Sequence, residues 1–303
     1  MRFLHCSDLH VTQRYRHVPW LSLGWHRWAA MWEVTVRGRG EAYRNAGLTV
    51  EQIVRDLEGH GADHLLVSGD FTGYAMEDEF RAARAALGLV GRSRATCSVI
   101  PGNHDTFTPE SVQCNRFEQH FGDLLESDLP EYCAVGPYPF IHLKNDDVAV
   151  VGLHSAQKAL FPGFAYGEVG RTQLDALAAL VDDRRVRHRA VLVMVHHAPF
   201  RADGTPDVAH HGLRDAASLN AVLRGERFAL LHGHLHERFH LAATSSRPQT
   251  FCAGSSTLRG NEGYWVIDVV DCRISGTAHV RAPVSALSRT PSLAPSRATE
   301  SVH

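Results

Sequence analysis

Short clusters of Asp, Asn and His residues recur along the 303-residue chain, each directly after an apolar run. In chain order they are Asp8 and His10, Asp70, Asn103 and His104, His196, and finally His234 and His236. Carboxylate, amide and imidazole groups are typical ligands of divalent metal ions. Even without His104, these donors are too many for one tetrahedral zinc site. The sequence therefore predicts two divalent ions that share a carboxylate.

The spacing within the paired clusters sets an expectation for their geometry. Asp8 and His10 are separated by one residue, and so are His234 and His236. On an extended segment alternate side chains point the same way, so each pair can reach one ion. Mixed oxygen and nitrogen donors favour Mn, Fe, Zn or Co over Ca or Mg. Two such ions can supply a hydroxide nucleophile and hold a phosphoryl group for in-line attack.

The elements that position these clusters alternate between strands and helices. Apolar runs that end at a cluster predict strands at residues 2–7, 64–68, 96–100, 190–195 and 228–231. Helical patterns lie at residues 49–59, 77–89, 109–125, 170–183 and 215–223. We expect the first of these helices to open with a capping box at Thr49. This order predicts a largely parallel sheet, in which ligands gather at the carboxyl ends of the strands.

The second half of the chain predicts antiparallel strands as well. A hairpin is expected around Asn145, between residues 140–143 and 148–153. Alternating runs follow at residues 239–243, 249–253, 264–270 and 276–281. We therefore expect an α/β fold with two packed sheets in its core.

The composition is that of an ordinary globular protein, with 44% hydrophobic and 21% charged residues. A formal net charge of −2 does not favour a nucleic-acid partner. The six cysteines form no Cys-x-x-Cys pair and lie mostly in apolar runs, so we expect reduced thiols. No signal-peptide pattern opens the chain, and no apolar run approaches the ~20 residues of a membrane span. We expect a cytoplasmic protein.

The segment 11–48 contains four of the five tryptophans. Trp25, Trp28 and Trp32 have helical spacing, which predicts an aromatic stripe on a helix. Three roles stay open for this segment. It packs on the domain, it caps the active site, or its residues 18–36 contact an apolar substrate or a membrane surface. The Ser-, Pro-, Ala- and Arg-rich tail at 283–303 is expected to be disordered, which leaves one domain at 1–282.

The clusters and their neighbours resemble the calcineurin-like metallophosphoesterase superfamily across residues 2–258. The motifs in order are Asp8-x-His10, Gly69-Asp70, Gly102-Asn103-His104-Asp105, His196 and Gly233-His234-x-His236. Within the superfamily, the chain looks most like the bacterial cyclic-nucleotide phosphodiesterase type, on the strength of Pro101 before the third motif and His197-Ala198-Pro199 after His196. The resemblance implies a four-layer α/β/β/α sandwich with a central pair of mixed β-sheets.

Position by position, the resemblance implies two sets of metal ligands that share a bridging carboxylate from Asp70. The implied ligands are Asp8, His10 and His236 for the first ion, and Asn103, His196 and His234 for the second. His104 is implied to be catalytic: it would stabilise the transition state or protonate the leaving oxygen, oriented by Asp105. The pair His210-His211 has no such role, and we expect both side chains to be solvated.

We therefore expect a metal-dependent phosphoric ester hydrolase that acts on phosphodiesters, with phosphomonoesters as a second substrate class. The Asp-Arg-Gly of Ser/Thr protein phosphatases is missing after Asp70, and Gly73 stands where purple acid phosphatases place a Tyr ligand. The expected partner is a small phosphoester such as a nucleotide or a lipid headgroup. One alternative is a lipid-linked or nucleotide pyrophosphatase with segment 11–48 as an apolar cap. Another is a non-catalytic metal-binding scaffold. The oligomeric state stays open.

Overall fold

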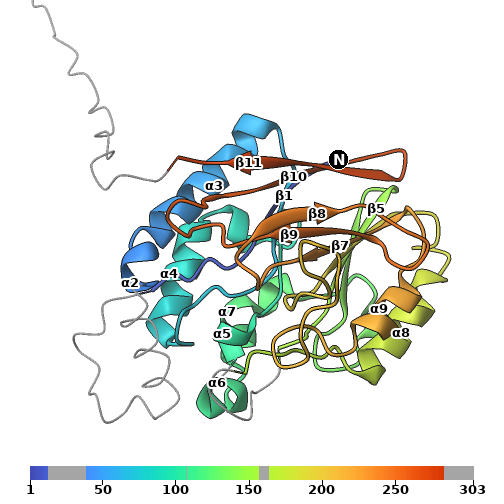
Figure 1. Ribbon diagram of the computed structural model, residues 1–303, viewed down its shortest axis with the longest axis horizontal. Coiled ribbons are helices and arrows are strands. Elements are labelled where there is room, and N and C mark those ends of the chain that lie inside the picture. The colour runs from blue at the N-terminus through green and yellow to red at the C-terminus, as the bar shows by residue number, and fades with distance from the viewer. Residues whose placement is uncertain (13–38, 107, 157–163, 283–303) are drawn as a thin grey trace, which may run out of the picture.

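Two β-sheets face each other at the centre of the computed structural model, which describes residues 1–12, 39–106, 108–156 and 164–282 (Figure 1). The first sheet has the strand order β11-β10-β1-β2-β3. Its strands are β1 (Arg2–Cys6), β2 (His64–Val67), β3 (Cys97–Val99), β10 (Gly263–Val270) and β11 (Arg273–Val280). β1, β2 and β3 are parallel, whereas β10 runs antiparallel to both β1 and β11. The sheet is therefore mixed.

The second sheet has the order β4-β5-β6-β7-β9-β8. Its strands are β4 (Phe140–Lys144), β5 (Val148–Gly152), β6 (Ala190–Met194), β7 (Phe228–His232), β8 (Arg238–Leu241) and β9 (Gln249–Ala253). The four inner strands are parallel, and the edge strands β4 and β8 are antiparallel to their neighbours. The predicted hairpin and the antiparallel close of the chain are both confirmed.

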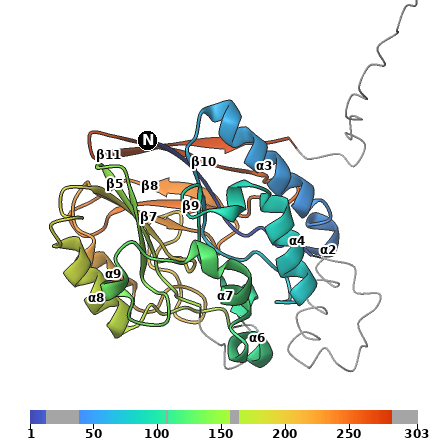
Figure 2. The ribbon, with the colours of Figure 1, turned by 180° about the vertical axis from the view of Figure 1, so that it is seen from behind.

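Helices cover the outer faces of the two sheets, as the front and back views show (Figures 1 and 2). Those near the first sheet are α2 (Arg39–Ala42), α3 (Ala46–His60), α4 (Glu77–Leu87), α5 (Asn103–Thr106), α6 (Pro109–Gln113) and α7 (Arg116–Phe121). Those on the second sheet are α8 (Arg171–Val181) and α9 (Ala216–Val222). The expected α/β/β/α sandwich with a central pair of mixed sheets is confirmed.

The sequence of strand β6 is a continuous apolar run, and the packing of the strand explains why. Leu192 and Met194 lie in the core between the two sheets, whereas Val191 and Val193 lie in the core under α8 and α9. A strand covered on both faces must be apolar at every position, because it has no solvent-facing side. Burial of both faces also fixes the register of the strand and hence the position of the residue that follows it.

Two helix predictions were wrong in detail. α3 begins at Ala46, so Thr49 lies in its first turn, where its hydroxyl donates to the carbonyl of Asn45 at 3.2 Å. The single helix expected at 109–125 is divided into α6, α7 and a 3-10 turn at Gly122–Leu124. The break is at Asn115, whose φ of 47° is left-handed, a conformation that Asn tolerates better than most residues.

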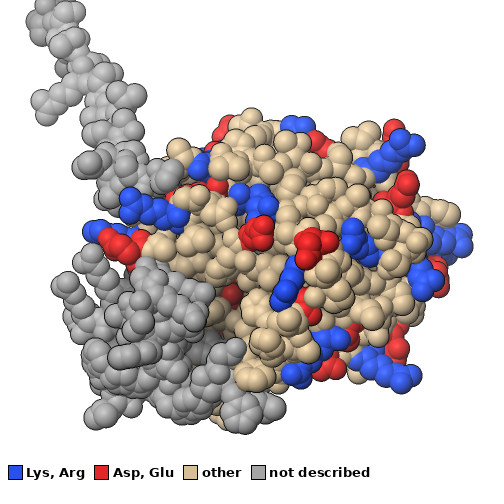
Figure 3. Space-filling view, in the orientation of Figure 1, with Lys and Arg blue, Asp and Glu red and all other residues tan. Residues whose placement is uncertain are grey.

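Residues 13–38, with the four tryptophans, and the tail at 283–303 lie outside the described residues, so the expectations for them and for the domain at 1–282 stay predictions. None of the described helices has the length and hydropathy that crossing a membrane requires. On the described surface that Figure 3 shows, basic and acidic side chains are interspersed. The basic side chains do not gather into a stripe on that face.

Candidate metal centre

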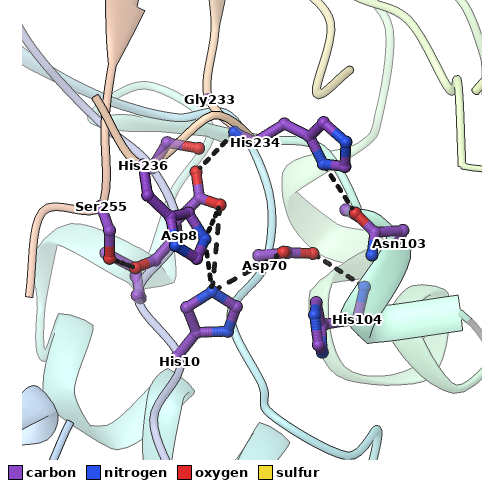
Figure 4. A network of polar contacts seen from close by, with 12 residues as sticks. Asp8, His10, Asp70, Asn103, His104, Gly233, His234, His236 and Ser255 are labelled. Carbon is purple, nitrogen blue, oxygen red and sulfur yellow. Dashed lines mark hydrogen bonds and ion pairs between the residues drawn. The ribbon is translucent and has the colours of Figure 1, made fainter. Parts of the chain in front are cut away.

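The predicted ligands meet at one edge of the sandwich, beyond the carboxyl ends of β1, β2, β3, β6 and β7 (Figure 4). Two overlapping groups have ligand atoms that all lie within 4.8 Å of one another. The first group is Asp8, His10 and His236, and the second is Asp8, Asp70 and His196. The side chains of Asn103 and His234 border the second group.

The first group places nitrogen and oxygen lone pairs opposite one another. His10 Nδ1 donates to the carbonyl of Thr72 at 3.2 Å, so Nε2 of the neutral ring carries a lone pair. That nitrogen lies 3.3 Å from His236 Nε2, which is itself 3.2 Å from Asp8 Oδ1. Asp8 Oδ1 is buried and accepts no hydrogen bond from the described residues. These atoms repel one another unless a proton on His236 Nε2 or a bound cation lies among them.

The second group has the same character. His196 Nδ1 donates to the carbonyl of Ser68 at 2.8 Å, and His234 Nε2 donates to the carbonyl of His211 at 2.9 Å. The opposite nitrogens, His196 Nε2 and His234 Nδ1, each lie 3.0 Å from Asn103 Oδ1. With neutral rings, three lone pairs converge here. Only positive charge, from a proton or a metal ion, stabilises this arrangement.

Asp70 lies between the two groups. Its Oδ2 is 3.8 Å from His10 Nε2, and its Oδ1 is 3.5 Å from His196 Nε2. The amide of His104 donates to Oδ1 at 2.8 Å and so fixes the rotamer of the carboxylate. One side chain thus reaches both groups, as a bridging ligand must. The donor set fits two divalent ions.

The ionisation of these groups favours bound cations. Burial alone would raise the pKa of Asp8, but the adjacent imidazole of His236 and the charge of His196 hold it well below its usual range. Burial opposes ionisation of Asp70 in the same way, and the charges of His196 and His104 outweigh it and lower its pKa. Burial lowers the pKa of His10 to about 3, so its imidazole is neutral at pH 7. Ionised carboxylates beside the neutral imidazole of His10 are the protonation states that metal binding needs. Burial would lower the pKa of His196, but the charge of Asp70 raises it to about 9, so His196 must release a proton when an ion binds.

The backbone at the site corrects one expectation. The paired residues were expected on extended segments, but their φ angles are left-handed: 52° at Asp8, 42° at His10, 73° at His234 and 57° at His236. Asp70, with a φ of 56°, is the same. A left-handed residue with a Cβ costs roughly 1–2 kcal/mol, and such strain concentrates at functional sites. Turns after the strands, not extended chain, bring the ligands together.

Two glycines make room for the carboxylates. A Cβ on Gly233 would lie 2.1 Å from Asp8 Oδ2, and a Cβ on Gly102 would lie 2.1 Å from Asp70 Oδ1. The close approach of Gly233 lets the amide of His234 donate to Asp8 Oδ2 at 2.9 Å, which leaves Oδ1 directed at the first group. These glycines are required by the site itself.

The predicted catalytic residue His104 adjoins both groups, with its ring 4.9 Å from that of His10. Its Nδ1 donates to the carbonyl of Gly73 at 2.9 Å. The expectation that Asp105 orients this ring is wrong. The carboxylate of Asp105 instead accepts hydrogen bonds from the amides of Gly102 at 2.9 Å and Thr72 at 3.0 Å. It holds two loops together, because those amides would otherwise be buried without acceptors.

Tyr43 borders the first group and was not identified from the sequence. Its hydroxyl lies 3.5 Å from His236 Nδ1 and 3.1 Å from Ser255 Oγ. Ser255 Oγ in turn donates to the carbonyl of Asp8 at 2.8 Å. The directions are consistent if His236 Nδ1–H donates to Tyr43, which directs the lone pair of Nε2 into the site. No motif around Tyr43 indicated this role.

His211 was expected to be solvated, but it contacts the second group. Its Nδ1 is 2.8 Å from Asp207 Oδ2, and its ring centroid is 4.2 Å from that of His234. His197 bonds to Ser155 Oγ at 2.9 Å and belongs to neither ligand group.

A pocket of about 340 Å³ lies beside His236. Arg238, Asn261 and Trp265 contribute to its wall. The guanidinium of Arg238 donates to the carbonyl of Asn261 at 3.0 Å and makes no ion pair with any described residue. Glu237 lines the same pocket, so its wall carries a guanidinium and a carboxylate that do not form an ion pair with each other.

The chain belongs to the calcineurin-like phosphoesterase family, whose sequence profile matches residues 1–238. Membership makes it a metal-dependent phosphoesterase and implies the dinuclear centre of divalent ions that the groups around Asp70 fit. No curated protein sequence matches the chain.

Solved structures support the same fold. A dimetal phosphatase from Danio rerio is 13% identical, with 93% of this chain and 96% of that chain covered and a TM-score of 0.64. The purple acid phosphatase PPD1 from yellow lupin seeds is 11% identical, with 93% and 52% covered and a TM-score of 0.53. At these identities the likeness concerns the fold alone.

Proposed function

We propose that the protein hydrolyses small phosphodiesters at a centre of two divalent metal ions. The observation that carries this proposal is the position of Asp70, whose oxygens reach both ligand groups. The first ion, Mn, Fe, Zn or Co, would be held by Asp8, His10 and His236, and the second by Asn103, His196 and His234, with Asp70 shared. When bound, the ions supply activated water and offset the charge on the phosphoryl oxygens.

His104 would act as the acid. Its amide is fixed to Asp70 and its Nδ1–H to the carbonyl of Gly73, so the proton that it can donate is the one on Nε2. A departing alkoxide needs a proton, and a positioned imidazolium supplies it without crossing into bulk solvent. Because His104 lies outside both ligand groups, it can transfer a proton without releasing a metal ion.

The pocket beside His236 supports an organic substrate larger than inorganic phosphate. The exposed edge of Trp265, which is 7% accessible, lines that pocket together with the guanidinium of Arg238 and the carboxylate of Glu237. A nucleotide-like diester combines a flat ring with negative charge, and the resemblance of Pro101–Asp105 and His196–Pro199 to cyclic-nucleotide phosphodiesterases agrees with it. We therefore place cyclic nucleotides and similar diesters first among substrates and phosphomonoesters second.

The cytoplasm would suit such an enzyme. All six cysteines are free thiols, and Cys6, Cys97 and Cys252 are buried. Burial raises the pKa of Cys97 to about 12, so it behaves as a core residue and not as a nucleophile. Thiols that are kept reduced agree with a reducing compartment.

The test is a substrate panel with metal analysis of the same preparation. Bis(p-nitrophenyl) phosphate, p-nitrophenyl phosphate, cyclic nucleotides and amphiphilic pyrophosphates are compared with and without added Mn, Fe, Zn or Co. The proposal predicts metal-dependent turnover with preference for diesters. A preference for pyrophosphates would favour the pyrophosphatase alternative. Two bound ions with no turnover of any substrate would favour the metal-binding scaffold.

A further inference from the structure

A larger cavity, of about 590 Å³, lies at the edge of the sandwich opposite the metal centre. Its wall includes Met1, Asp63 and Ala95, which come just before the parallel strands β1, β2 and β3, whereas the metal ligands follow those strands. Lys144, at the end of β4, lines the same cavity from the second sheet. The volume is within the roughly 300–1,000 Å³ of sites that take small molecules.

Lys144 is an unusual residue in this chain. The sequence has 29 arginines but only two lysines, Lys144 and Lys158. The side chain of Lys144 is buried, with 8% exposure, in a position where a charged amine is costly. Arg cannot lose its proton in a protein, whereas a buried Lys can.

The amine is held by two carbonyl groups and no carboxylate. Lys144 Nζ donates to the carbonyl of Arg94 at 2.6 Å and to that of Ala95 at 3.3 Å. No carboxylate of the described residues lies within ion-pair distance of it. The nearby Asp128 is already engaged, because it pairs with the guanidinium of Arg94 and accepts from the amide of Leu143 at 2.8 Å.

The charged groups around the amine do not neutralise its positive charge. Burial is the main cause that lowers the pKa of Lys144 to about 8; Asp128 opposes this shift and Arg94 adds to it. His142 and His64 add no further positive charge, because burial lowers both their pKa values and keeps them neutral. Near pH 8, much of Lys144 is a neutral amine. Its two N–H groups can remain on the two carbonyls, so the lone pair occupies the remaining direction.

We propose that Lys144 is an acylation site for small activated acyl donors, acyl phosphates or acyl thioesters, that enter this cavity. The lone pair of Nζ forms a bond to the acyl carbon. The bond from that carbon to the phosphate oxygen or the thioester sulfur breaks, and the leaving group departs with the electron pair. Nζ then loses one proton to water. The product is an uncharged amide, so acylation removes the unpaired charge from the interior.

The test follows acetylation of the intact protein by peptide mass spectrometry. Acetyl phosphate is used in one arm and the acetyl thioester of N-acetylcysteamine in the other, across pH 6 to 10. Lys144 of the same chain unfolded in concentrated urea is the reference. At pH 8 an amine with the lowered pKa has roughly a hundredfold larger neutral fraction. With the lower nucleophilicity of a weaker base, about tenfold faster acetylation of Lys144 remains.

Two further results identify the site. The rate at Lys144 should level off above pH 8 to 9, whereas the rate at an ordinary lysine still rises at pH 10. In concentrated urea Lys144 should lose its fast reaction and react as an ordinary lysine, because the cavity no longer exists. Lys144→Arg should remove the fast product.

Equal rates at Lys144 in the folded and the unfolded chain, or a rate at Lys144 that still rises from pH 9 to 10, would overturn the proposal. Reaction with only one of the two donors would support it and name the class of donor. The readout is independent of hydrolysis, so it does not depend on the proposed phosphodiesterase activity.

Discussion

His104 donates its Nδ1–H to the carbonyl oxygen of Gly73 across 2.9 Å. This hydrogen bond fixes the tautomer of the ring, because a carbonyl can only accept. The carboxylate of the adjacent Asp105 takes no part in it and binds backbone amides on either side. The orientation of the proposed acid therefore depends on the loop after β2, and its second proton lies on Nε2.

Replacement of His104 should separate catalysis from metal binding. We expect His104→Asn to lower kcat on bis(p-nitrophenyl) phosphate by about 10²- to 10⁴-fold, the usual contribution of a general acid. The content of metal ions, measured by elemental analysis, should not change, because His104 belongs to neither ligand group. Loss of metal in this variant would contradict the assignment and make His104 a ligand.

The neighbouring carboxylate gives the matched control. Asp105→Asn removes a charge beside His104 but leaves the bond from His104 to Gly73 intact. Its kcat should keep the pH dependence of the parent. Its melting temperature should fall, because the amide side chain of Asn offers the N–H groups of Thr72 and Gly102 one acceptor oxygen in place of two. A shift in the pH profile of kcat would show that Asp105 acts on the ring after all.

The two carboxylates of the centre should differ in how much metal they hold. Asp70 reaches both ligand groups, so Asp70→Asn should lower the bound metal from two ions to fewer than about one per chain. Asp8→Asn should have the smaller effect and leave about one ion, because the ligands proposed for the second ion, Asn103, His196 and His234, are retained together with Asp70. Elemental analysis after gel filtration measures both. Equal losses in the two variants would contradict the bridging position of Asp70.

A methyl group at Gly233 should disrupt the first ligand group. Its Cβ would lie 2.0 Å from Ser7 Oγ and 2.1 Å from Asp8 Oδ2, so the carboxylate must move. We expect Gly233→Ala to lose hydrolysis and to cost about 1–3 kcal/mol of stability, as overpacking does. Gly59→Ala is the control. Gly59 lies in α3 with no atom within 4 Å of a Cβ, so the change should stabilise the protein by about 1 kcal/mol.

The sequence predicted the strands and the ligands for the same reason. A strand buried on both faces, such as β6, must be apolar throughout, and the polar residue that follows, such as His196, then stands out. The local backbone could not be predicted in this way. The left-handed φ of Asp8 depends on the amide of His234 and on the absence of a side chain at Gly233, which lie more than two hundred residues away. The position of Tyr43 depends on such contacts too.

Stability should fall as the pH is lowered, because histidines buried between the sheets are neutral in the folded chain. His142 Nδ1 bonds to Ser98 Oγ at 2.7 Å, and Ser98 Oγ also bonds to His64 Nε2 at 2.8 Å. Burial, followed by the charge of Lys144, lowers the pKa of His142 from 6.5 to about 3. Its contribution to stability is therefore complete above pH 6.5. Below that, the unfolded chain binds a proton that the folded chain does not.

Between pH 6 and 4, this residue alone should lower the free energy of unfolding by up to about 1.4 kcal/mol per pH unit. Urea unfolding at several pH values measures the slope. His142→Gln should reduce this slope by up to about 1.4 kcal/mol per pH unit, which corresponds to one proton. The exposed His188 provides the control, because His188→Gln removes an imidazole that folding does not bury. An unchanged slope in His142→Gln would show that His142 is protonated in the folded state.

The hydroxyl of Tyr43 should tune the first metal site without belonging to it. It is placed to accept the Nδ1–H of His236 at 3.5 Å and to donate to Ser255 Oγ at 3.1 Å, which keeps the lone pair of His236 Nε2 toward Asp8. Tyr43→Phe retains the ring against His10 but removes that acceptor. Outer hydrogen bonds of this kind contribute about 10- to 100-fold to metal affinity. We expect a competing chelator to remove one ion at a chelator concentration about 10- to 100-fold lower than the parent protein requires, while the second ion stays bound. Tyr132→Phe deletes a hydroxyl that bonds to Asp183 Oδ2, outside both ligand groups, and should leave both ions in place. If the two variants release metal alike, the bond between Tyr43 and His236 does not set the tautomer.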